Sequence, residues 1–170
     1  MKKLLLAIAA VAALCIIAIL GILLYIGVKG PETFVVSGQQ MNRAHARIVR
    51  DLGLLNDSEK IHYFYSDALL DIRQGMYFVT TKRLVLYSDE WEDPKLVTPL
   101  AAIIDAEGEF NESFFEDSYI TVTLNTGEEW TFPISSEKGK DQAFYDFLIS
   151  RSSMDSFDGR DLPLEANDVN

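Results

Sequence analysis

The chain has 170 residues and a formal net charge of −11, with 48% hydrophobic and 24% charged residues. This balance excludes a globally disordered chain, and the acidic excess argues against nucleic-acid binding, which needs clustered Lys and Arg. Cys15 is the single cysteine, so an intrachain disulfide and a Cys-rich metal site are also excluded.

The first predicted element is an uncharged apolar run over residues 4–28, which follows Lys2 and Lys3. As a helix it would be about 37 Å long, and the hydrocarbon core of a bilayer is about 30 Å thick. We therefore expect an uncleaved transmembrane helix in a single-pass protein. The alternatives are a cleaved signal peptide, for which the run is too long, and a lipidated cysteine at Cys15, which follows the poorly matching Leu14.

The charges that flank this run predict its orientation. Lys2, Lys3 and the N-terminal amine favour an N-terminus inside, while Lys29 on the other side keeps the charge difference small. We expect a location in the inner membrane of a bacterium, with the following domain outside the cytoplasm. The orientation stays open because so few charges decide it.

A short amphipathic helix is predicted within the juxtamembrane segment, residues 29–53. Ser37 and Gln40 have the spacing of a capping box, which predicts a helix over 38–52, and Gly53 is a typical C-terminal stop. Spacings of three and four residues predict one apolar face, made of Met41, Ala44, Ile48, Leu52 and Leu55.

A basic stripe follows the same predicted helix, at Arg43, Arg47 and Arg50. Attraction to anionic headgroups is one interpretation, but polybasic clusters of this kind usually hold 4–8 cations. A solvated face is therefore favoured, and the three arginines are kept as candidate contacts for an anionic partner.

Alternating apolar residues and turn signals predict a domain of about seven short antiparallel strands over residues 54–151. An amphipathic helix closes it at 137–151, and an acidic, flexible tail follows at 152–170. The strands are expected at 61–65, 75–80, 83–88, 95–99, 102–110, 118–124 and 128–134, with a hairpin turn at Asn125-Thr126-Gly127.

The stretch GMYFVTTKRLVLY, residues 75–87, carries a family likeness. It resembles bacterial PH and GRAM-like domains, in which a strand with Gly and Thr is followed by a Lys-Arg turn and an apolar strand that ends in an aromatic residue. The likeness covers residues 59–151. It implies a mainly β fold, a bent barrel plugged by the C-terminal helix. Phe144, Phe147 and Leu148 would fill the open end, with Trp130 and Phe132 as neighbours.

Lys82 and Arg83 lie at the predicted tip of this hairpin and are interpreted mainly as turn residues, with a weak anion contact as the alternative. The alternation of a strand assigns its side chains to two faces. The predicted inward set is Met76, Phe78, Leu84 and Leu86, and the other face takes Tyr77, Val79, Val85 and Tyr87.

No motif predicts catalysis. The only histidines, His45 and His62, lie on different predicted elements, and neither a nucleophile elbow nor a phosphate-binding loop is present. The acids from Asp105 to Glu116 are spaced like the ends of a calcium loop, but Phe110 stands where such a loop needs glycine. We expect no enzyme activity, no cofactor and no metal. An enzyme with an unrecognised site is the alternative.

An acidic surface is the remaining candidate site. It comprises Asp105, Glu107, Glu109, Glu112, Glu116 and Asp117. On a strand the first three would alternate on a solvent face, where they serve solubility or a basic partner.

The predicted function is that of a membrane-anchored, non-enzymatic PH-like interaction or scaffold protein, which presents an edge strand or a loop surface to a protein partner. The alternative is a module that binds a lipid headgroup or another ligand at the membrane surface. Phosphoinositide binding is disfavoured, because the loop over residues 66–74 holds Arg73 against Asp67 and Asp71. The partner, the pathway and the oligomeric state stay open.

Overall fold

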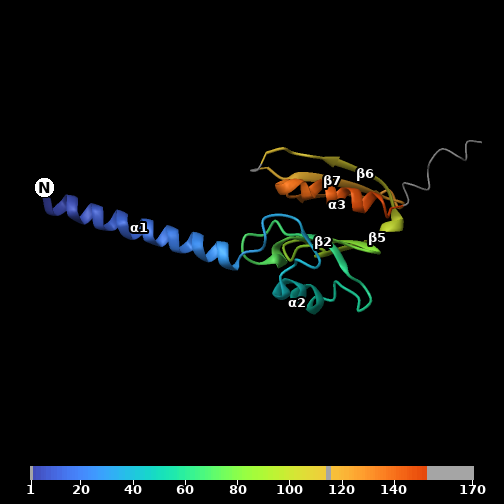
Figure 1. Cartoon of the computed structure of the whole chain (residues 1–170), viewed down its shortest axis with the longest axis horizontal. Helices are drawn as coiled ribbons and strands as arrows, with labels where there is room; N and C mark the ends of the chain where they lie inside the picture. Colours follow the sequence, from blue (N-terminus) through green and yellow to red (C-terminus); the bar gives the residue numbers. More distant parts are fainter. Residues whose placement is uncertain (1, 114–115, 153–170) are drawn as a thin grey trace, which may run out of the picture.

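The computed structural model describes residues 2–113 and 116–152. Its first element is α1 (Lys2–Lys29), which extends away from the β domain (Figure 1). Apart from Ser152, the tail predicted as flexible lies outside the described residues.

The predicted membrane anchor is not supported. A spanning helix needs about 20 consecutive apolar residues. Over the residues that the structure describes, no helix is both long enough and apolar enough to cross a membrane. The prediction of a transmembrane helix at 4–28 is therefore wrong, and so are the single-pass topology and the inner-membrane location that depended on it.

Antiparallel strands form two sheets within the described residues, instead of the single bent barrel of about seven strands predicted from sequence. The predicted mainly β class is corrected to a mixed α/β fold. The larger sheet has the order β1 (Val36–Ser37), β2 (Ile61–Tyr65), β3 (Met76–Thr80), β4 (Arg83–Tyr87) and β5 (Lys95–Pro99). The smaller sheet has the order β6 (Ile103–Glu109), β7 (Ser118–Leu124) and β8 (Glu129–Ile134).

The predicted amphipathic helix exists as α2 (Arg43–Asp51), and it starts later than expected. Ser37 and Gln40 do bond to each other, but in a turn that precedes the helix, and Asn42 is the N-cap that accepts from the Ala44 amide at 2.9 Å. Gly53 ends the helix as predicted, with a φ of 65°.

The predicted apolar face of this helix is confirmed except at Ala44. Met41 is buried, and Ile48, Leu52 and Leu55 are partly buried against the same core cluster. His45 and Val49 are the buried residues of α2, whereas Ala44 is exposed. His45 was not predicted to be buried, because a count of apolar residues does not include histidine.

The larger sheet is covered on both faces, which explains why β3 is buried along its whole length. One face packs with α2 and the segment before it, through Met76, Phe78, Val85 and Tyr87. The other face packs against the smaller sheet and α3 (Lys140–Ile149), through Tyr77, Val79, Leu84 and Leu86. Figure 1 shows α2 on one side of this sheet and β6, β7 and α3 on the other. The predicted inward set therefore mixed two faces, because β3 and β4 pair Tyr77 with Leu86 and Phe78 with Val85.

The C-terminal helix is confirmed, although the predicted helix at 137–151 is divided. A 3-10 turn, η3 (Glu137–Gly139), precedes α3, and Lys138 and Gly139 separate the two with φ values of 64° and 61°. Phe144 is fully buried, and its ring contacts Phe132 at 6.0 Å between centroids. Two further 3-10 turns, η1 (Ile72–Gln74) and η2 (Leu100–Ala102), connect strands.

Candidate functional site

The two cations at the hairpin tip have different surroundings: Arg83 contacts other parts of the protein, and Lys82 is exposed. Arg83 Nε donates to Glu59 Oε1 at 2.9 Å, and Arg83 Nη2 bonds to Glu59 Oε2 and to the Leu54 carbonyl. The Glu59 side chain is 1% exposed, and the bonds from Arg83 lower its pKa below the usual range. Arg83 therefore joins the hairpin to the segment before β2, while Lys82 stays exposed.

The predicted arginine stripe lies on α2, and its three members have different surroundings. All three side chains are exposed. Arg50 lines a pocket between α2 and the start of β2, and Arg43 and Arg47 do not. The structure thus brings one arginine of the stripe together with the hairpin tip, where Thr81 also lines the pocket.

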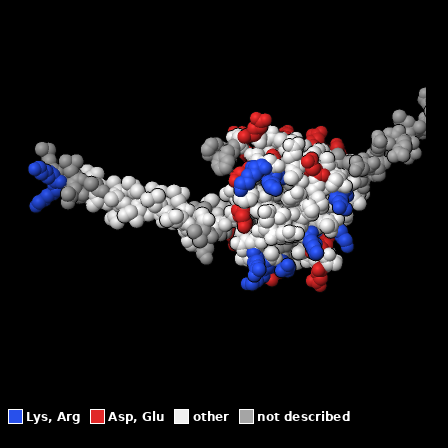
Figure 2. All heavy atoms as spheres, viewed as in Figure 1, with Lys and Arg blue, Asp and Glu red and all other residues white. Residues whose placement is uncertain are grey.

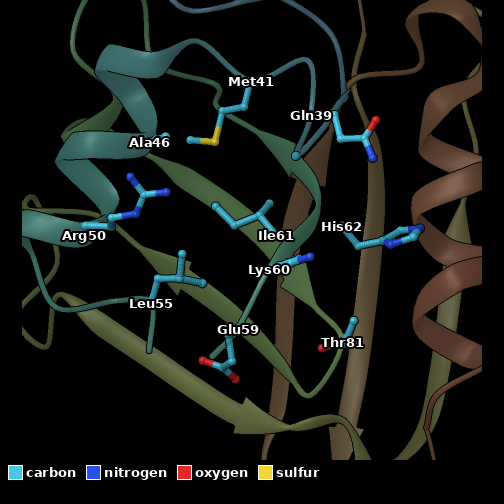
Figure 3. Close-up of a pocket in the computed structure, with 11 residues that line it drawn as sticks. Gln39, Met41, Ala46, Arg50, Leu55, Glu59, Lys60, Ile61, His62 and Thr81 are labelled. Carbon is cyan, nitrogen blue, oxygen red and sulfur yellow. The ribbon is translucent and has the colours of Figure 1, made fainter. Parts of the chain in front are cut away.

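This pocket has a volume of about 310 Å³ (Figure 3). Apolar side chains from α2, the loop before it and β2 form much of its wall, and charged or polar side chains surround them (Figure 3). Its lining is Gly38, Gln39, Met41, Ala46, Arg50, Leu55, Glu59, Lys60, Ile61, His62 and Thr81.

The acidic candidates separate into two groups. Asp105, Glu107 and Glu109 are exposed along β6, with Ala106 buried between them, as the predicted alternation required. Their partners in the register with β7 are Thr123, Thr121 and Tyr119. Figure 2 shows Asp and Glu side chains along the upper edge of the domain, where Figure 1 places β6 and β7.

The loop between β6 and β7 holds the other three acids. Glu112 is exposed, and Glu116 accepts a bond from the Asn111 amide nitrogen at 2.8 Å. Asp117 has an internal role, since both its oxygens accept from the Tyr65 hydroxyl at 3.1 Å. It therefore ties the larger sheet to this loop and does not belong with the exposed row on β6.

A second tyrosine makes a similar contact. Tyr77 donates to Asp67 Oδ2 at 2.9 Å, and its ring stacks with that of Tyr65 at 6.2 Å. Burial raises the pKa of both phenols well above the ordinary value, and the carboxylates beside them add to the effect. In the same loop Arg73 pairs with Asp71 at 2.9 Å. The loop considered for headgroup binding thus holds its cation in a local ion pair.

The two histidines have different surroundings. His62 stacks on Phe147 with 3.7 Å between ring centroids, and His45 Nδ1 lies 3.4 Å from Glu32 Oε2 in the interior. Within residues 2–113 and 116–152, no group of three or more His, Cys, Asp or Glu side chains could hold a metal ion.

Sequence reasoning did not identify the pocket or two of the charged residues that line it. Glu59 and Lys60 precede β2 and carry no motif. The one available signal for these two residues was their position, because both lie next to a strand that pairs with the Lys-Arg hairpin.

Comparisons with known proteins bear on the fold alone. No family model matches the chain, and no curated protein matches it. Among solved structures, a DUF1696 family protein with a pleckstrin-homology domain from Shewanella loihica PV-4 is 18% identical, with a TM-score of 0.46, and the match covers 72% of this chain and 98% of that one. The chain is similar in fold to bacterial pleckstrin-homology proteins.

Two further structures are comparable. A pleckstrin-homology domain from Shewanella amazonensis SB2B is 16% identical, with a TM-score of 0.43, over 60% of this chain and 83% of that one. A PH-domain-containing protein from Exiguobacterium sibiricum 255-15 is 17% identical, with a TM-score of 0.45, over 69% of this chain and 60% of that one. All three TM-scores are below 0.5, and the matches assign no ligand and no partner to this chain.

Proposed function

We propose that this chain is a non-enzymatic interaction domain that binds a protein partner through the outer face of the β6–β8 sheet. The observation that carries the proposal is the row of exposed carboxylates Asp105, Glu107 and Glu109 on β6. The three carboxylates lie on a strand that is held by a ladder with β7, so they present fixed charges to a partner. Such fixed charges favour a partner with basic side chains and speed its association.

The side chains beside the acidic row suit an interface. Tyr119 is 47% exposed and lies opposite Glu109 in the ladder. Thr121 bonds through its hydroxyl to Thr131 on β8 at 2.9 Å. Exposed tyrosine is enriched in interfaces because it offers a large rigid ring together with a hydroxyl. The face thus combines charge, hydrogen-bonding groups and one aromatic anchor.

The edges at β6 and β5 are less suitable than this face. At the β6 edge, the Tyr145 hydroxyl of α3 donates to the Ala106 carbonyl at 2.9 Å, which occupies part of the backbone. At the other sheet, β5 is short and ends in Pro99, which has no N–H to donate. Strand addition needs a run of free backbone groups, so the sheet face is the favoured surface.

The non-enzymatic part of the proposal rests on the surroundings of the histidines. Catalysis by acyl transfer needs a base in contact with a nucleophile. The ring of His62 is stacked on Phe147, and His45 faces Glu32. Neither arrangement offers a proton acceptor to a hydroxyl or a thiol among the described residues.

A photo-crosslinking amino acid at Tyr119 tests the proposed surface in cells. We expect one discrete adduct, which is lost when Glu107→Gln and Glu109→Gln are combined. The matched control places the same amino acid at Trp91, an exposed aromatic in the β4–β5 turn, where we expect no adduct. A second control combines Glu90→Gln with Glu92→Gln and should leave the Tyr119 adduct unchanged. The absence of a discrete adduct, or equal adducts from both positions, would overturn the proposal.

A further inference from the structure

The pocket between α2, β2 and the hairpin tip lies away from the proposed protein-binding face. It adjoins the side of the larger sheet that packs with α2, whereas the smaller sheet packs on the opposite side. Its volume of about 310 Å³ is at the lower end of the range for small-molecule sites. The pocket therefore requires an explanation separate from that of the acidic face.

The charge balance of this pocket is positive, in a chain whose net charge is −11. Its lining holds one carboxylate, Glu59, which is already neutralised by Arg83 and also accepts from the Asn56 amide at 3.2 Å. Arg50 and Lys60 line the same pocket and form no ion pair with any described residue. The lining thus holds two cations without an ion pair, and its only acid already has a partner.

Lys82, at the hairpin tip, adds a further positive charge near the pocket. It is exposed, forms no ion pair within the described part of the chain, and lies close enough to Glu59 to help lower the pKa of that carboxyl. Figure 3 shows the guanidinium of Arg50 and the ammonium of Lys60 on either side of Ile61 in that view. An anion at the pocket would therefore meet positive charge from more than one direction.

The rest of the pocket wall is apolar. Met41 and Ala46 contribute from the α2 side, and Leu55 and Ile61 contribute from the segment that leads into β2 (Figure 3). An inorganic anion gains no binding free energy from such a surface, whereas a ligand with a short hydrocarbon part gains it by burying that part against the wall. The wall thus favours an organic anion over a simple one.

The backbone holds this wall in a fixed shape. The β2–β3 ladder shifts register between Ile61 and Tyr63, which leaves His62 directed to the stack with Phe147. Gly38 approaches β2 so closely that a Cβ atom there would lie 2.0 Å from the Ile61 carbonyl oxygen. The Gly38 amide also donates to the His62 carbonyl at 3.0 Å. A pocket built on such contacts is preformed, which lowers the entropic cost of binding.

We propose that this pocket binds a small organic anion, with a carboxylate or phosphate head attracted by the charges of Arg50 and Lys60 and a short apolar body against Met41, Leu55 and Ile61. Both heads accept charge-assisted hydrogen bonds from guanidinium and ammonium groups. The site is independent of the proposed protein-binding face, so each proposal can fail without the other.

Binding of four probes to the full chain tests the proposal by isothermal titration calorimetry and by amide chemical shifts. Hexanoate and hexyl phosphate carry both required parts and differ in the head. Hexanol lacks the charge, and inorganic phosphate lacks the apolar body. We expect one or both organic anions to bind with shifts at the pocket residues, and the preferred head identifies the anion class.

Variants assign the binding to the pocket. Arg50→Gln and Lys60→Gln should each lower the affinity for the organic anion by about tenfold, because each removes a charge-assisted bond. Arg47→Gln is the matched control, since it removes an exposed arginine of the same helix outside the pocket. It should leave affinity unchanged at constant ionic strength.

Four results would contradict the proposal. Binding of neither organic anion, equal binding of hexanol, or equal losses in Arg47→Gln and Arg50→Gln would each contradict a site of this kind. Inorganic phosphate that binds as tightly as hexyl phosphate would contradict the role of the apolar wall.

Discussion

Arg83 binds both carboxylate oxygens of Glu59, so the tip of the β3–β4 hairpin is fastened to the segment that precedes β2. The residue that resembles a surface cation in the sequence is thus a structural one. This contact also removes the one negative charge from the pocket beside it.

Replacing Arg83 tests this contact. Arg83→Leu leaves a buried, unpaired carboxylate at Glu59, and we expect a loss of about 3 kcal/mol in the free energy of unfolding. Urea denaturation of the full chain measures it, with Lys82→Gln as a control that should stay within about 0.5 kcal/mol of the parent. Adding Glu59→Leu to Arg83→Leu should recover part of the loss. A double variant as unstable as the sum of the two single variants would contradict the pairing.

Acid should weaken the same contact. The folded-state pKa of Glu59 is lowered, so its contribution to stability is fully present above the unfolded value of about 4.3 and is lost as pH falls through the folded value. We expect the stability difference between the parent and Glu59→Gln to be constant above about pH 5.5 and to shrink below about pH 4.3. Thermal or urea unfolding from pH 7 to pH 3 measures this. A difference that stays constant to pH 3 would show that Glu59 has an ordinary pKa.

The buried tyrosines should resist alkaline titration. Tyr65 and Tyr77 have raised pKa values, so the absorbance gain of tyrosinate at pH 11 should come from other tyrosines. Tyr65→Phe and Tyr77→Phe should therefore leave the absorbance gain of the folded protein unchanged. The stability supplied by the raised pKa values is present below about pH 10 and falls as pH rises further. Circular dichroism at each pH confirms that the chain stays folded. A reduced gain in Tyr65→Phe would contradict the buried contact with Asp117.

Gly38 should not tolerate a side chain. Its added Cβ atom would meet the Ile61 backbone at 2.0 Å, which cannot be relieved by a rotamer change. We expect Gly38→Ala to cost about 2 kcal/mol in the free energy of unfolding, as overpacking typically does. Gly21→Ala is the matched control, because nothing lies within 4 Å of its added Cβ. Equal stabilities of the two variants would show that β1 and β2 do not approach as closely as described.

Local sequence patterns predicted several elements correctly because their signals are local. The β3–β4 hairpin follows from two apolar runs around a short polar centre, and the β7–β8 turn follows from Gly127, whose φ is 86°. The alternation of Asp105, Glu107 and Glu109 with Ala106 likewise identified the solvent face of β6.

The failures concern contacts between distant segments. The faces of β3 could not be assigned from alternation, since both faces are apolar and both are buried. The partner of Arg83 lies 24 residues earlier in the chain, and no pattern connects the two positions. The length and hydropathy of the N-terminal run predict a membrane anchor, which the described residues do not support.

The candidate site was recovered only in part. Asp117 counted as surface acid in the sequence, but its bond to Tyr65 depends on how the two sheets meet. The sequence does not distinguish Arg50 from Arg43 and Arg47, and only the position of β2 shows that Arg50 lines the pocket. Sequence composition supplied the candidates, and the tertiary arrangement separated those with internal partners from those that face outward.

The proposed interaction face is tested most directly by the affinity of the partner captured at Tyr119, purified and titrated against the full chain. We expect the dissociation constant to rise with salt, and to rise by about tenfold when Glu107→Gln and Glu109→Gln are combined. The pair Glu90→Gln and Glu92→Gln should bind like the parent. A dissociation constant that changes neither with salt nor with the Glu107 and Glu109 substitutions would contradict the account.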